Sequence, residues 1–236
     1  MKTHIKNDLN KFHILTIIDK DYPASLKYIN DPPLVLYALG QRALLHHCPT
    51  LSVIGTRHPS KDAIKKMNFI LNPLLENDWL IVSGMAKGID SYAHEIALLK
   101  RRLTIAVLGS GFHHIYPRQN KRLFKAIAKH GLLLSEYAPH IPPKRYHFPE
   151  RNRIISGLSF GTLVIEASER SGTFITVDQA LDQGREVYAV PDSPLKPQTK
   201  GCHRLIQEGA KLVMHANDIR EDWQRINHLF NNTNLP

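Results

Sequence analysis

Cysteine is scarce in this sequence of 236 residues, which contains only Cys48 and Cys202. Neither belongs to a CxxC pair or to a cluster of potential metal ligands, so we expect two free thiols in a reducing compartment rather than a disulfide. No apolar run approaches the roughly 20 residues of a membrane-spanning helix, and the N-terminal MKTHIKNDLN lacks the apolar part of a secretory signal. We therefore expect a soluble, cytoplasmic protein with no membrane partner.

Acidic residues are missing from a long interval between Glu95 and Glu136, although the chain has 21 of them against 31 lysines and arginines. The same interval holds the basic residues Lys100, Arg101, Arg102, Arg118, Lys121, Arg122, Lys125 and Lys129. The next basic residues are Lys144, Arg145, Arg151 and Arg153, and Glu150 is the single acid among them. The formal charge of +10 and its concentration favour a phosphate-bearing partner, and the alternative is a solvated cationic face.

Short apolar runs predict the strands of a sheet at 51–55, 80–84, 103–109, 132–136, 162–167, 186–190 and 211–214. Their apolar character is continuous rather than alternating, which is typical of parallel strands covered on both faces. Apolar residues at helical spacing lie between them, in 61–76, 90–100, 118–129 and 174–183. This alternation predicts an α/β fold with a Rossmann-like, doubly wound and mostly parallel sheet.

The predicted sheet divides the chain into three parts. Residues 1–45 contain Tyr22-Pro23 and Asp31-Pro32-Pro33, which indicate turns, and we expect a short N-terminal extension there. Residues 46–215 are expected to form the Rossmann-like domain. Residues 216–236 are polar and end in NNTNLP, so we expect a frayed C-terminal tail.

Ligands bind to doubly wound sheets beyond the carboxyl ends of the strands, where this sequence places several glycine and hydroxyl residues. These loops contain the candidate phosphate ligands Gly55 and Arg57, Ser83 and Gly84, and Ser171, Gly172 and Thr173. Free backbone amides at a following helix N-terminus attract an anion, and an arginine adds a forked donor. Each loop by itself is also consistent with an ordinary strand-end turn or a capped helix.

Catalytic and metal-binding motifs are missing from the sequence, which has no GxxxxGK[ST] phosphate loop and no GxSxG nucleophile motif. His94-Glu95 does not continue to the second histidine of HExxH, because Leu98 stands there. His113-His114 has no carboxylate or cysteine near it in sequence. We interpret His94 as a packing residue, and we predict a binding protein, not an enzyme, with no catalytic residue, metal or cofactor.

Several blocks follow one another in order: IGTR (54–57), SGMAKGID (83–90), VLGSG with YP and N following (107–120), FPERNRIISGLS (148–159), TLVIEASERSGTFITVDQAL (162–181), and GREVYAVP with GCHRLIQEGA (184–210). Together these blocks resemble the DNA-processing protein A family, also called DprA or Smf. The resemblance implies an extended Rossmann domain in 46–215 that binds single-stranded DNA. It also implies a homodimer that protects incoming DNA and loads the recombinase RecA onto it during natural transformation.

The stretch HFPERNRIISG places Phe148 and two arginines beside the apolar pair Ile154-Ile155. By the resemblance, the polar residues Arg151, Asn152 and Arg153 face the DNA, and the apolar pair anchors their helix in the core. Phe148 is expected to stack on a base, because stacking suits a binder that accepts any single-stranded sequence.

The resemblance also implies that Arg57 and Lys144 contact phosphates from neighbouring loops, and that the dimer face lies near 190–215. Members of the family often carry a C-terminal winged-helix domain. The residues after 215 are too few for one, so we expect none in this chain.

An alternative to a DNA-binding protein is an enzyme with the same fold, a nucleotide phosphoribohydrolase. Its PGGxGTxxE signature lies on the loop after the strand that corresponds to 162–167. Here the loop reads ERSGTFIT, so Gly172-Thr173 match but Thr176 stands in place of the glutamate. Cleavage through an oxocarbenium-like centre needs a carboxylate, which argues against that activity. A further hypothesis is a nucleotide sensor that binds a small phosphorylated ligand in the same loops.

Overall fold

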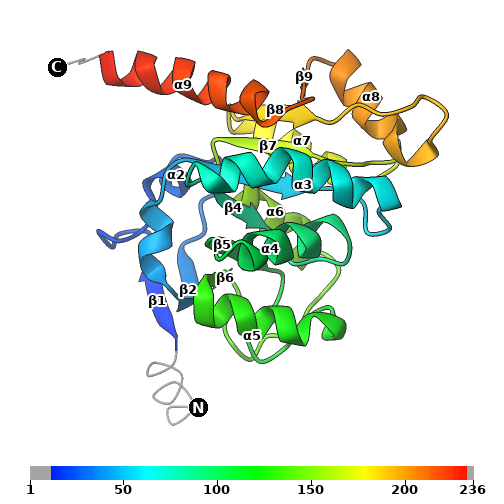
Figure 1. The fold of residues 1–236 in the computed structure, drawn as a ribbon. Helices are drawn as coiled ribbons and strands as arrows, with labels where there is room; N and C mark the ends of the chain where they lie inside the picture. The colour runs from blue at the N-terminus through cyan, green and yellow to red at the C-terminus, as the bar shows by residue number, and fades with distance from the viewer. Residues whose placement is uncertain (1–11, 233–236) are drawn as a thin grey trace, which may run out of the picture.

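The computed structural model describes residues 12–232, with side chains as far as residue 227. Within this range a nine-stranded sheet has the order β1-β2-β6-β5-β4-β3-β7-β8-β9 (Figure 1). Its strands are β1 (His13–Thr16), β2 (Val35–Gly40), β3 (Thr50–Ile54), β4 (Leu80–Ser83), β5 (Thr104–Leu108), β6 (Leu132–Ser135), β7 (Gly161–Val164), β8 (Glu186–Ala189) and β9 (Lys211–Leu212). From β6 to β9 in this order, neighbouring strands are parallel. The predicted doubly wound, mostly parallel α/β fold is confirmed.

Helices cover both faces of the sheet. The described helices are α2 (Ala24–Lys27), α3 (Lys61–Glu76), α4 (Ile89–Leu99), α5 (Lys121–His130), α6 (His147–Gly157), α7 (Thr173–Asp182), α8 (Lys200–Gln207) and α9 (Ala216–Asn232), with short 3₁₀ turns η1 (Arg42–His46), η2 (Arg118–Asn120) and η3 (Pro197–Thr199). Helices α3, α4, α5 and α9 pack on one face, and α2, α6, α7 and α8 pack on the other.

The two-sided cover explains the continuous apolar strands. In β4, Leu80 and Val82 pack against the α6 side, whereas Ile81 packs against the α3 and α4 side. Successive side chains of a strand point to opposite faces, so a strand buried on both faces needs an apolar residue at every position. The predicted strand runs are confirmed for this reason.

The order of strands reverses beside β3. The chain passes from β3 through β4 and β5 to β6 in one direction, then returns to β7, which pairs with the other side of β3. The loops after β3 and β7 therefore leave the sheet toward different helices. In doubly wound sheets this point holds the ligand crevice.

Residues 13–40, which belong to the predicted N-terminal extension, add two antiparallel strands to the same sheet. Strand β2 pairs with β6, so that Tyr37 lies opposite Ser135. Between β1 and β2 the predicted turns are held by the Tyr22 hydroxyl, which donates to the Pro33 carbonyl oxygen at 2.6 Å. Residues 1–11 lie outside the described range.

His94 is fully buried in α4, where its Nδ1 lies 2.7 Å from the Thr104 hydroxyl oxygen. Burial lowers the pKa of His94 to about 3, so the imidazole is neutral at physiological pH. This position agrees with a packing role. In the part of the chain that the structure describes, no cluster of His, Cys, Asp and Glu is arranged to hold a metal ion, and no helix is long and apolar enough to cross a membrane.

The prediction of a frayed polar tail at 216–236 is wrong for most of that segment, because α9 continues from Ala216 to Asn232. Ile219 is fully buried, and the Trp223 ring packs edge-on against Phe160 at 5.1 Å and Trp79 at 6.1 Å between centroids. In a mostly polar segment, apolar residues at helical spacing, such as Ile219 and Trp223, are enough to dock an amphipathic helix. In Figure 1 this helix lies along one edge of the α3 layer.

We predict that Ile219→Ala lowers the free energy of unfolding by about 2–5 kcal/mol, since it removes a buried side chain and leaves a cavity. Urea unfolding followed by circular dichroism measures the change. Gln224→Ala, at an exposed position of the same helix, is the matched control and should leave stability within about 0.5 kcal/mol. An Ile219→Ala protein as stable as the control would show that α9 does not contribute to the core.

Candidate nucleic-acid interface

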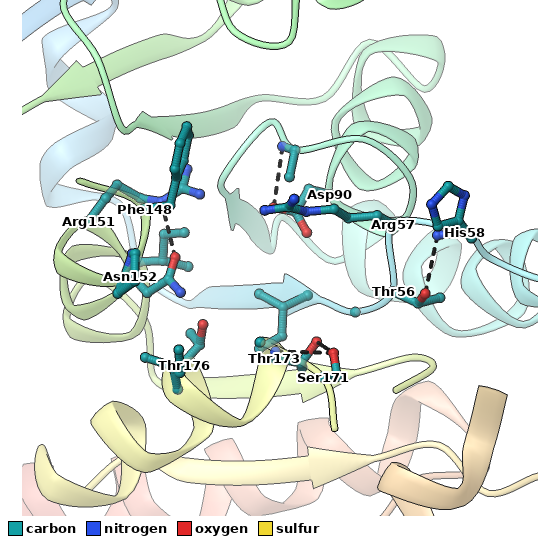
Figure 2. Close-up of a pocket in the computed structure, with 17 residues that line it drawn as sticks. Thr56, Arg57, His58, Asp90, Phe148, Arg151, Asn152, Ser171, Thr173 and Thr176 are labelled. Carbon is teal, nitrogen blue, oxygen red and sulfur yellow. Dashed lines mark hydrogen bonds between the residues drawn. The ribbon is translucent and has the colours of Figure 1, made fainter. Parts of the chain in front are cut away.

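A pocket of about 440 Å³ opens where the strand order reverses, at the carboxyl ends of β3 and β7. Its walls come from the loops after these strands and from the first turns of α4, α6 and α7. Figure 2 shows Arg57 and His58 on one side, Phe148, Arg151 and Asn152 on the other, and the start of α7 between them. The volume suits a small molecule or a single nucleotide unit.

Most of the residues predicted from the sequence lie together in this pocket, namely Gly55, Arg57, Phe148, Arg151, Asn152, Ser171, Gly172 and Thr173. They come from loops that are far apart in the chain. The carboxyl ends of parallel strands share one edge of the sheet, and this brings the loops together.

Arg151 is the buried centre of the pocket wall, with only 4% of the residue exposed. Its Nη1 donates to the carbonyl oxygens of Gly84, at 2.6 Å, and Val107, and its Nε donates to Asn152 Oδ1 at 3.1 Å. A Cβ at position 84 would overlap the guanidinium, so this approach requires glycine. Burial lowers the pKa of Arg151 to about 10, which leaves it charged at neutral pH. Nη2 makes no hydrogen bond to the described residues and can still serve a ligand.

Asp90 is a buried carboxylate in the pocket wall that the sequence motifs did not single out as a site residue. Its Oδ2 accepts hydrogen bonds from the backbone N–H groups of Gly84, at 3.2 Å, and Ala86, at 3.4 Å. Burial raises the pKa of Asp90, while the positive charge of Arg151 acts in the opposite direction. The carboxylate therefore holds the β4–α4 loop and partly balances the buried guanidinium.

Arg57 is the exposed cation of the pocket. No hydrogen bond or ion pair joins its side chain to the described residues, but its charge acts on both Asp90 and Arg151. A guanidinium that has no partner among the described residues and lies at a pocket edge can bind a phosphate with two donors.

The loop that carries Arg57 is fixed by Glu166, which is fully buried after β7. The Glu166 carbonyl oxygen accepts from the Thr56 N–H at 2.8 Å. Its carboxylate accepts from the Ser60 N–H at 2.9 Å and the Ser60 hydroxyl at 2.6 Å, and it pairs with Lys66 at 3.0 Å. Lys66 also pairs with Asp192 at 2.9 Å. The loops after β3, β7 and β8 are thus joined by one buried ionic group.

Phe148 lies half-buried at the rim, in the first turn of α6. Position 109 must be glycine, because a Cβ there would stand 2.8 Å from Phe148 Cδ1. The ring packs against Tyr116, with 5.1 Å between centroids. An aromatic ring held in this way at a cationic pocket is suited to stack on a base.

The loop before α7 adds hydroxyl groups and a helix N-terminus. The Ser171 and Thr173 hydroxyl oxygens are 2.8 Å apart, and Ser171 Oγ accepts from the Thr173 N–H at 3.2 Å. Ser171 therefore binds an amide of the helix start, as in an ordinary cap, while the positive end of α7 still faces the pocket. Thr176, where a phosphoribohydrolase has its glutamate, lines the same pocket.

Arg153 does not share the pocket with Arg151, which corrects the expectation that both face DNA. Its Nη2 lies 2.8 Å from Glu136 Oε1 and its Nε lies 2.9 Å from Asp31 Oδ2. Residues two apart on an α-helix point about 200° away from each other, so adjacent cations of α6 face opposite sides. Arg153 therefore attaches α6 to the β1–β2 segment.

Ser83 is fully buried, and its hydroxyl donates to the Val53 carbonyl oxygen at 2.6 Å. It links β3 to β4 and does not reach the pocket. Gly84 lies behind Arg151. Lys144 is exposed in the loop before α6, outside the pocket lining, with its ammonium 5.5 Å from the centroid of the Tyr146 ring.

Sequence reasoning missed several lining residues, namely Thr56, His58, Ala86, Asp90 and Thr176. Each lies beside a predicted strand end or in the helix that follows it. The signal that places them was therefore present in the sequence, but their residue types alone did not identify them as ligands.

The pocket lies at the switch point of the sheet, which is where α/β proteins of the doubly wound class bind their ligands. The family model described as "DNA recombination-mediator protein A" matches residues 13–224, and the chain belongs to this family. It is 46% identical over 208 residues to the DNA processing protein DprA of Bacillus subtilis, covering 88% of this chain and 70% of the relative.

Two solved structures of DNA processing protein A share the fold. The Streptococcus pneumoniae protein has a TM-score of 0.88 at 44% identity, with 94% of this chain and 77% of that chain covered. The Helicobacter pylori protein, whose structure concerns a single-stranded DNA binding mode, has a TM-score of 0.81 at 28% identity, with 91% and 96% covered. A molybdenum cofactor binding protein from Rippkaea orientalis is similar in fold alone, with a TM-score of 0.53 at 18% identity.

We predict that Glu166→Gln loosens the Arg57 loop, because glutamine keeps the size of the side chain but loses the charge that pairs with Lys66. The free energy of unfolding should fall by about 1–3 kcal/mol, and trypsin should cut faster after Arg57. Glu169→Gln, at an exposed position before α7, is the control. Limited proteolysis with mass spectrometry and urea unfolding make the comparison. Equal cleavage and equal stability in the two variants would contradict a positioning role for Glu166.

Proposed function

We propose that this chain binds single-stranded DNA in the pocket at the ends of β3 and β7. The observation that carries the proposal is the exposed Arg57 guanidinium, facing Phe148 across a pocket that also presents Arg151 Nη2 and the α7 N-terminus. These groups offer a phosphate two cations and a base one aromatic ring. Family membership and the single-stranded DNA binding of the Helicobacter pylori relative support the same ligand.

The size of the pocket favours an unpaired strand over a duplex. A space of about 440 Å³ can take one nucleotide unit, and the base must be free of its partner to reach a ring at the rim. Stacking is tolerant of sequence because every base has an aromatic face. We therefore infer binding with little dependence on base identity.

We infer further that this cytoplasmic protein receives incoming DNA, protects it and loads RecA onto it during natural transformation. The names of its DNA-processing relatives support this role, and we propose that it is carried out by binding rather than catalysis. The acidic residue of the pocket, Asp90, is engaged with backbone amides, and Thr176 stands where a hydrolase would need a carboxylate.

We also propose a homodimer whose contact lies in 190–215. Three large apolar side chains of this segment are exposed: Leu195 by 88%, Leu212 by 46% and Met214 by 56%. Exposed apolar groups gathered in one segment are typical of a protein contact. Sedimentation velocity tests this point independently of DNA.

The test of the function is a fluorescence anisotropy titration with labelled oligo-dT and a matched duplex, at about 50 and 200 mM salt. We expect tighter binding to the single strand and a steep salt dependence. RecA filament assembly on strands already coated with single-strand binding protein is then measured with and without this chain, and faster assembly is expected. Equal affinity for the strand and the duplex would overturn single-strand binding, and unchanged assembly would overturn RecA loading alone.

We predict that Arg57→Ala weakens oligo-dT binding by about 1–3 kcal/mol, or roughly 5- to 150-fold, because it removes a charge-assisted phosphate contact. Stability should not change, since the side chain has no partner among the described residues. Arg101→Ala removes an equal charge from an exposed position before β5, at the opposite edge of the sheet, and serves as the control. If both variants bind alike, Arg57 is not a DNA ligand.

A further inference from the structure

Tyr116 extends the aromatic surface beyond the pocket. It is 48% exposed, it lies in the loop after β5, and its ring packs against Phe148 at 5.1 Å between centroids. The Phe148 ring therefore lies at the pocket rim, and the neighbouring Tyr116 ring is exposed to solvent. The two ring planes are inclined to each other by 44°, so successive unpaired bases can stack one on each ring where the strand bends between them.

The loop that presents Tyr116 is anchored on both sides. The buried Asn120 donates through Nδ2 to the Met85 carbonyl oxygen and to Ser91 Oγ, both at 2.8 Å. The Ser110 hydroxyl donates to the His114 carbonyl oxygen at 2.7 Å. A platform held by such bonds needs little ordering when a ligand binds.

Exposed cations follow Tyr116 directly in the sequence. Arg118, Lys121 and Arg122 are exposed in η2 and the first turn of α5, and none of them forms an ion pair with the described residues. The chain has no acid between Glu95 and Glu136 to balance them locally. Exposed aromatic groups followed by exposed positive charges match the bases and the backbone of a single strand.

We propose that the strand leaves the pocket across Phe148 and Tyr116 and that its phosphates continue over Arg118, Lys121 and Arg122. This path rests on the proposed function, because it begins at the pocket. Tyr116 is then a second stacking residue, and the start of α5 is part of the DNA-binding surface. The alternative role of Tyr116 is to support Phe148 without touching DNA.

The first test compares Tyr116→Ala with the unchanged chain on the mononucleotide dTMP and on oligo-dT of about 16 nucleotides. The mononucleotide fills only the pocket, so its affinity should be retained. The long strand should bind about 5- to 150-fold more weakly, as expected for loss of one stacked base. Equal weakening for both ligands would assign Tyr116 to the support of Phe148 and overturn the path.

Tryptophan fluorescence then tests contact directly. The native tryptophans, Trp79 and Trp223, pack against each other where α9 docks on the core, away from this loop. In Tyr116→Trp, the long oligo-dT should quench the added fluorescence, because a stacked base quenches indole. Phe69→Trp, 63% exposed on α3, is the control that should not respond. An unquenched Trp at position 116 in a variant that still binds would overturn the proposal.

Charge is tested within one helix. Lys121→Gln/Arg122→Gln and Lys125→Gln/Lys129→Gln remove equal charge from exposed positions near to and farther from Tyr116. The salt dependence for the long strand should fall by about 0.7 in log–log slope for each phosphate that the first pair no longer neutralises, and by less in the second pair. Equal slopes in the two pairs would mean a general cationic attraction and overturn the path. Failure of the unchanged chain to bind the long strand would instead reject the proposed function.

Discussion

The burial of the Arg151 guanidinium is the constraint on which the pocket depends. Its Nη1 spans the carbonyl groups of Gly84 and Val107, so one side chain fixes α6 to the ends of β4 and β5. A charge can remain inside a protein only while its hydrogen bonds are made and an opposite charge is near. The strand-end carbonyls supply the first condition and Asp90 supplies the second. The missing Cβ of Gly84 leaves the space.

A second buried ionic group holds the opposite wall. Glu166 binds Ser60 and Lys66, and Lys66 reaches Asp192, so the loops after β3, β7 and β8 are joined to one another. Although burial opposes ionisation, the hydrogen bonds from Lys66 and neighbouring donors lower the pKa of Asp192 to about 2, so this carboxylate is ionised at neutral pH. Between these two rigid walls, Arg57 keeps its charge exposed. Some cations at the carboxyl edge of the sheet are paired within the protein, and others are exposed. The exposed cations make this edge a binding surface.

Much of the fold was predictable because its signals are local. A strand covered on both faces must be apolar throughout, and the run 132–136 therefore marks β6. The apolar residues at helical spacing in 61–76 likewise mark α3, which has the same bounds. Strand β1 was not predicted because it is a four-residue edge strand, HILT, with exposed positions. Strand β2 was not predicted either, although its residues VLYALG form an apolar run between β1 and β6, because the turn signals around it indicated an extension rather than a part of the sheet. Helix α9 was missed because its few apolar residues lie in a mostly polar segment.

The sequence by itself determined the parallel strands β3 to β9, the order of their loops and the residue types that gather at the carboxyl edge. It did so because strand and helix periodicity act over a few residues. Only the tertiary structure decided which cations are available to a ligand. Arg57, Arg151 and Arg153 are the same residue type, yet one is exposed, one is bound to carbonyl groups and one is paired with Glu136. Their environments are made by residues distant in the chain, so only the packed fold distinguishes them.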